Sequence, residues 1–81
     1  MINLSKIIEY DDTKEFLFSS DKNTIVILKY DDKIKYSVFR NFDISNCGEC
    51  DVVDLLEVLN KYNNNLIDNK YIFETIKEYG H

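Results

Sequence analysis

Proline and tryptophan are absent from this chain of 81 residues, and glycine, cysteine and histidine number only two, two and one. Two cysteines cannot form the dense disulfide framework of a small secreted domain. The longest apolar run, residues 25–28, is far shorter than the roughly 20 residues of a membrane-spanning helix. The N-terminus also lacks the charged and then apolar pattern of a signal peptide. The sequence therefore predicts a cytoplasmic protein.

The composition is that of a folded domain. Hydrophobic residues make up 44% of the chain and aromatic residues 14%, whereas disordered chains are depleted in both. A chain of this length has room for one modest core. We expect a single domain over residues 1–81.

Hydrophobic periodicity predicts an α+β fold of order αβββαα, with a short N-terminal helix, a three-stranded antiparallel sheet and two C-terminal helices. The first helix would begin at Asn3, although a strand over residues 7–10 is an alternative. The strands are predicted over residues 14–19, 24–30 and 34–42, with 24–30 in the centre.

The two C-terminal helices follow from apolar residues at helical spacing. Asn46 and Glu49 have the spacing of a capping box, and the first of these helices is predicted over residues 51–62. Its expected inner face consists of Val52, Leu55, Leu56, Leu59 and Tyr62. After three asparagines, the last helix is predicted to be capped by Asp68 or Asn69 and to end at Gly80.

The net charge of −5 is unevenly distributed along the chain. Residues 1–42 balance acids and bases, and so do residues 61–81. Between them lie five acids and no lysine or arginine: Asp43, Glu49, Asp51, Asp54 and Glu57. A surface of one sign attracts basic partners and repels nucleic acid. We predict that these carboxylates bind a protein with a basic groove, without direct nucleic-acid binding; the alternative is a solvated face.

Cys47 and Cys50 form a Cys-x-x-Cys motif, which suggests redox or zinc chemistry. No strand or proline is predicted where a thioredoxin-like fold needs them, and a structural zinc site requires four ligands. His81 would be the third ligand, and the fourth would have to come from a second chain. We predict two packing or loop cysteines, with no metal and no cofactor.

No combination of nucleophile, acid and base indicates catalysis, so the sequence does not predict an enzyme. The acid pairs, one of which is Asp31 and Asp32, lie in predicted turns. Beside that turn, Tyr30 and Tyr36 could anchor a protein partner, since tyrosine is enriched at binding hot spots.

The predicted order of elements, on an acidic chain of this length, resembles some phage-encoded anti-CRISPR proteins. The resemblance implies an inhibitor in the host cytoplasm that blocks the nucleic-acid-binding surface of a CRISPR-associated nuclease by DNA mimicry. We carry over no family residue, because no motif is shared. Two alternatives are a small oligomerising adaptor or structural subunit, for example a homodimer, and a zinc or redox Cys-x-x-Cys module.

Overall fold

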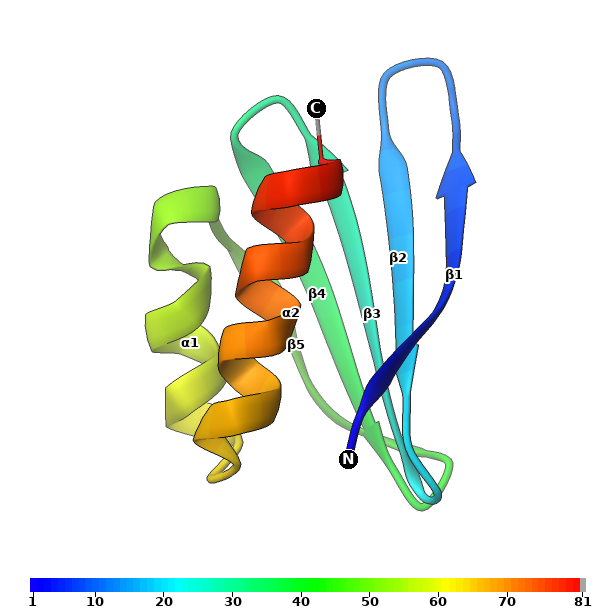
Figure 1. The fold of residues 1–81 in the computed structure, drawn as a ribbon, viewed down its shortest axis with the longest axis vertical. Helices are drawn as coiled ribbons and strands as arrows, with labels where there is room; N and C mark the ends of the chain where they lie inside the picture. The colour runs from blue at the N-terminus through cyan, green and yellow to red at the C-terminus, as the bar shows by residue number, and fades with distance from the viewer. Residues whose placement is uncertain (81) are drawn as a thin grey trace.

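The computed structural model describes residues 1–80, which form a five-stranded antiparallel sheet followed by two helices (Figure 1). Each strand pairs with the next along the chain, in the order β1-β2-β3-β4-β5. The predicted αβββαα fold class, with three strands and an N-terminal helix, is therefore wrong. The elements are β1 Asn3–Glu9, β2 Lys14–Ser19, β3 Asn23–Tyr30, β4 Lys33–Arg40, β5 Asp43–Asp51, the 3-10 turn η1 Val52–Asp54, α1 Leu55–Tyr62 and α2 Leu66–Tyr79.

Strand β1 occupies the residues for which the sequence predicted a helix. Leu4 lies opposite Phe18, and Ile7 lies opposite Phe16. The pairing shifts register between Leu4 and Lys6, and an extra residue in a strand brings side chains three positions apart onto one face. The spacing of Leu4 and Ile7 is therefore that of an irregular strand, although it matches a helical repeat.

Strand β5 replaces the predicted start of a helix, with its capping box at Asn46. Apart from Ile44, most residues of β5 have low strand propensity. It nevertheless pairs with β4 from Asp43 to Asp51, with one register irregularity at Ser45, so the neighbouring strand determines its conformation. The α-helix begins only at Leu55, after η1, and α1 is accordingly shorter than predicted.

The turn between β4 and β5 has a strained backbone. The φ angle is 52° at Asn41 and 70° at Phe42. Positive φ at both central residues is a feature of type I′ hairpin turns, which prefer Asn-Gly. A residue with a side chain costs roughly 1–2 kcal/mol in this region. Phe42 also exposes 91% of its surface, so little burial offsets that cost.

Both helices pack on one face of the sheet (Figure 1), where they enclose the core. Its buried apolar residues are Ile2, Phe16, Phe18, Ile25, Ile27, Ile34, Tyr36, Val38, Leu55, Leu59, Ile72 and Ile76. Successive side chains along a strand point to opposite faces. In the part of the chain that the structure describes, no helix covers the second face, which we call the open face.

The buried face of α1 differs from the predicted one. Leu55 and Leu59 are buried as expected. Leu56 is only half-buried and lines a groove between α1 and α2. Val58, which is absent from the predicted inner face, packs against the core. Val52, which was predicted on that face, lies in η1 before the α-helix begins.

Asparagine side chains fix the connection between the helices. Asn65 accepts a hydrogen bond from the Asp68 backbone N–H at 3.2 Å and caps α2. The fully buried Asn69 donates to the Asn63 carbonyl and to the Asn60 side chain, both at 2.9 Å. Helix α2 therefore begins before Asp68 and Asn69, which were the predicted caps and are buried instead.

The packing of α1 can be tested with two adjacent leucines. Leu55→Ala should lower the free energy of unfolding by about 2–5 kcal/mol, because it leaves a cavity in the core. Leu56→Ala should cost less than about 2 kcal/mol, because its side chain is partly hydrated in the folded state. Urea denaturation of both variants measures the difference. A loss for Leu56→Ala equal to or larger than that for Leu55→Ala would contradict the packing.

The strained turn predicts a stabilising substitution. Phe42→Gly should raise the free energy of unfolding by about 0.5–1 kcal/mol, because relief of the left-handed strain exceeds the entropy cost of glycine. Phe42→Ala removes the same ring but keeps the strain, so it should give no such gain. Equal stability of the Gly and Ala variants in thermal or urea unfolding would show that the turn is not strained.

Candidate functional site

The connectivity of the sheet gathers separate segments at one end. Alternate connections of an antiparallel meander lie at the same end of a sheet. The β1–β2 loop, the β3–β4 loop and the η1 turn therefore share one end with the C-terminus of α2 (Figure 1). These segments are far apart in the sequence, and each of the first three contains acidic residues.

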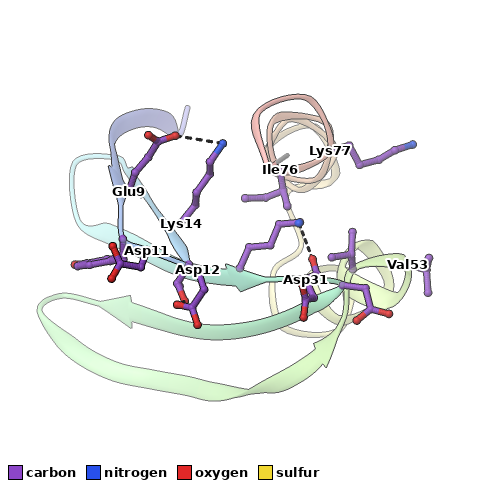
Figure 2. Close-up of a pocket in the computed structure, with 14 residues that line it drawn as sticks. Glu9, Asp11, Asp12, Lys14, Asp31, Val53, Ile76 and Lys77 are labelled. Atoms are coloured by element: carbon purple, nitrogen blue, oxygen red, sulfur yellow. Dashed lines mark hydrogen bonds and ion pairs between the residues drawn. The ribbon is translucent and has the colours of Figure 1, made fainter.

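An open pocket of about 760 Å³ lies at this end, between the β1–β2 hairpin and α2 (Figure 2). Val52, Val53 and Ile76 contribute apolar parts of its lining, and Asp54 follows Val53 in the chain. Five carboxylates line the pocket, and with Asp54 they form a group that we call the acidic end: Glu9, Asp11, Asp12, Asp31, Asp32 and Asp54.

Two of the three lysines that line the pocket contact residues of its own lining, and the third points away from it. Lys14 Nζ lies 3.3 Å from Glu9 Oε1 and donates to the Tyr79 carbonyl at 2.9 Å. An ammonium group at a helix C-terminus also interacts favourably with the helix dipole. Lys29 Nζ donates to the Asp31 carbonyl at 2.6 Å. Lys77 points away from the pocket (Figure 2), with its Nζ 5.3 Å from the centre of the Phe73 ring.

Most carboxylates of the acidic end have no cationic partner. Within residues 1–80, only Glu9 among the six takes part in an ion pair. Asp12 accepts a hydrogen bond from the Thr13 hydroxyl at 3.1 Å. The bases at the adjoining strand ends are Lys14, Lys29 and Lys33. Lys33 is paired with Asp51, and Lys77 is offset by the neighbouring Glu78. The acidic end therefore carries most of the net charge of −5.

The structure separates the five acids that the sequence grouped together. Glu49 pairs with Lys35 at 3.5 Å, and Asp51 pairs with Lys33. The hydrogen bond and charge of Asp51 raise the pKa of Lys33. Both bases lie on β4, outside the segment counted along the sequence. An acid-only stretch of sequence therefore becomes a partly neutralised edge strand.

The remaining predicted binding residues are dispersed. Asp43 begins β5, at the end of that strand opposite to Asp51, and Glu57 is exposed on α1. Asp54, Asp31 and Asp32 belong to the acidic end, and Tyr30 beside them is 37% exposed. Tyr36 is buried, with 8% of its surface exposed, and its ring packs near that of Tyr62. Tyr36 is therefore not a surface anchor.

Sequence reasoning missed Glu9, Asp11 and Asp12, and it assigned the pair Asp11 and Asp12 to a turn. A count of strands would have identified them. With five strands in a meander, the loops at residues 10–13 and 31–32 must lie at one end, together with the segment after residue 51. Because the sequence predicted a helix at the N-terminus, the hairpin of β1 and β2 was not counted.

The two cysteines do not converge. Both are free, and they lie three positions apart on β5, so their side chains point to opposite faces of the sheet. Cys47 is exposed on the open face, whereas Cys50 packs partly against the core. Burial, followed by the charges of Asp54 and Asp51, raises the pKa of the Cys50 thiol. The third candidate ligand, His81, lies outside the described residues.

Comparisons of the chain with protein-family models, curated proteins and solved structures found no match. Among residues 1–80, no helix has the length and apolar character needed to cross a membrane. Over the same range, no group of three or more His, Cys, Asp or Glu side chains is arranged to hold a metal ion. The arrangement of charge is therefore the main structural guide to function.

The cysteine geometry predicts unequal thiol reactivity. At pH 8, Cys50 in the Cys47→Ser variant should react with a maleimide more slowly than Cys47 in the Cys50→Ser variant. The reasons are that Cys50 is partly buried and that its raised pKa leaves less thiolate. The double Ser variant should still fold. Faster labelling of Cys50, or loss of folding together with bound zinc, would contradict this arrangement.

Proposed function

We propose that this chain is a binding protein that uses its acidic end to occupy a basic surface of another protein, of the kind that normally holds a nucleic-acid backbone. The observation that carries the proposal is that mostly unpaired carboxylates of the β1–β2 and β3–β4 loops line one pocket at the same end of the sheet. On β5, by contrast, Glu49 and Asp51 are paired with lysines. Charge concentrated at one end orients a molecule toward a partner of opposite sign.

The carboxylates are suited to lysine and arginine groups of a partner. They accept charge-assisted hydrogen bonds, which are shorter and stronger than neutral ones. Their position on hairpin loops exposes them beyond the ends of the strands. Asp11 and Asp31 lie in loops about two strand spacings apart, which is roughly 10 Å, whereas phosphates of one DNA strand are spaced about 3.4 Å apart. Any mimicry of DNA would therefore depend on negative charge and not on the spacing of the charged groups.

The class of protein that the acidic end binds is also a proposal. The resemblance to anti-CRISPR proteins depended on an order of elements that the five-stranded sheet replaces, so only the small size and the acidity still support it. A CRISPR-associated nuclease is one candidate among host enzymes that bind nucleic acid in a basic groove. In such an enzyme the bound chain would inhibit by excluding the nucleic acid.

A charge-neutralised variant tests the proposal. Immobilised protein would be exposed to a host lysate depleted of nucleic acid, and its captured partners would then be challenged with a 20-base-pair DNA duplex. We expect the duplex to displace them. The triple variant Asp11→Asn, Asp12→Asn, Asp32→Asn should slow association with a purified captured partner by roughly tenfold or more at low salt, because rim charges mainly raise the association rate. It should also flatten the salt dependence.

The matched control removes three acids elsewhere, by Asp21→Asn, Glu57→Gln and Glu74→Gln, and gives the same change in net charge. This control should associate nearly as fast as the parent protein. Equal losses in the two triple variants would show that only net charge matters. Unchanged association of the acidic-end variant, or partners that the DNA duplex does not displace, would overturn the proposal.

A further inference from the structure

The central strands carry apolar residues on both of their faces. On β2, Leu17 lies between the buried Phe16 and Phe18, and on β3, Val26 follows the buried Ile25. Strands with continuous apolar runs are typical of sheets covered on both sides, whereas a solvated face usually alternates with polar residues. The helices cover only one face here (Figure 1), so the open face retains apolar side chains without a cover.

The strand register places these side chains in a continuous diagonal line. Phe39 lies opposite Ile44, and Leu17 lies opposite Val26. Leu28 is the next residue of β3 on the same face, and Ile8 completes the line on β1. We call this line across all five strands the open-face belt: Ile8, Leu17, Val26, Leu28, Phe39 and Ile44. Ile44 is 59% exposed, and the other five residues of the belt are partly exposed. Contiguous apolar residues at a surface mark interaction sites more often than scattered ones do.

The charges beside the belt cancel, in contrast to the acidic end. Three bases and three acids share the open face: Lys6, Lys33, Lys35, Glu15, Glu49 and Asp51. Four of them form the pairs Lys35–Glu49 and Lys33–Asp51. A neutral face on a chain of net charge −5 can meet an identical face without direct repulsion.

We propose that the open face binds a second copy of this chain, to give a two-fold symmetric dimer whose sheets pack face to face. A two-fold interface must be complementary to itself, and a straight apolar belt with balanced flanking charge meets that condition. Sheets packed in this way lie about 10 Å apart and interdigitate the side chains of their inner faces. The carboxylates of the acidic end lie in loops beyond the face, so they stay hydrated in the dimer.

The size of the open face limits the area that a dimer can bury. Five strands about 4.8 Å apart and roughly seven residues long give a face of roughly 600 Å². Two copies would therefore bury about 1,200 Å², at the low end of the range for specific interfaces. We expect reversible association that depends on protein concentration.

The two sheet edges are less suited to self-association. A register irregularity interrupts the β1 edge, and bulges protect edges from pairing. On the β5 edge, antiparallel pairing of two copies centred on Cys47 would place Asp43 opposite Asp51. Like charges directly opposite each other destabilise such a pair. The open face is therefore the preferred contact between copies.

Sedimentation velocity from 1 µM to 1 mM tests the dimer. The parent protein should shift from monomer to dimer over this range, and Val26→Lys at the centre of the belt should weaken dimerisation by roughly tenfold or more. Ile67→Lys is the matched control, because Ile67 is 73% exposed and lies in α2, off the open face and outside the acidic end. It should dimerise as the parent protein does.

Two further measurements keep the test decisive. Circular dichroism and urea unfolding establish that Val26→Lys folds, and Phe39→Ser replaces it if it does not. Maleimide labelling of Cys47, which lies on the open face beside Ser37, should slow several-fold as the Cys50→Ser variant dimerises. A parent protein that stays monomeric at 1 mM would overturn the proposal. The open face would then contact a different protein or solvent. A dimer that Val26→Lys does not weaken would overturn the proposal as well.

Discussion

Each strand of this sheet returns beside the strand that precedes it, and the rest of the structure depends on that antiparallel pairing. The pairing brings the β1–β2 loop, the β3–β4 loop and η1 to one end of the sheet, so that their carboxylates lie at the same end. It also imposes strand conformation on β5, whose own residues have little tendency to form a strand. The separation between an acidic end and a neutral open face is a direct result.

Two short helices complete the domain by covering one face only. Helix α1 contributes Leu55 and Leu59 to the core, and α2 contributes Ile72 and Ile76. The buried Asn69 fixes the connection between the helices through hydrogen bonds to Asn60 and Asn63. Their combined surface cannot enclose a five-stranded sheet on both sides. The apolar residues of the open face are thus left to another molecule, in our proposal a second copy.

The sequence predicted the strongly patterned parts of the fold. The aromatic and branched residues of β2, β3 and β4 identify those strands and place β3 in the centre, and the repeat of Ile72 and Ile76 identifies the last helix. The sheet edges were predicted wrongly for physical reasons. A register irregularity gives β1 a helical spacing at Leu4 and Ile7, and β5 takes its conformation from its neighbour. The strand propensities of a segment's own residues do not show which other strand it pairs with in the folded protein.

The sequence predicted only part of the candidate site, again because local patterns do not show how the strands pair. Asp31, Asp32 and Asp54 were identified, but Glu9, Asp11 and Asp12 were not, because their position depends on the number of strands. Glu49 and Asp51 were assigned to a binding face, yet they pair with Lys35 and Lys33 across the sheet. Charge counted along the chain cannot include such cross-strand partners.

The separation of charge can be measured on the isolated protein by NMR, with paramagnetic co-solutes of opposite charge. A cationic co-solute should relax the amide protons of residues 10–13, 31–32 and 52–54 more strongly than an anionic one, because it concentrates near the acidic end. Amides of the neutral open face, such as those of Val26 and Leu28, should show little preference. The preference should weaken as salt is added. A uniform ratio of the two effects over the whole chain would contradict the concentration of charge at one end.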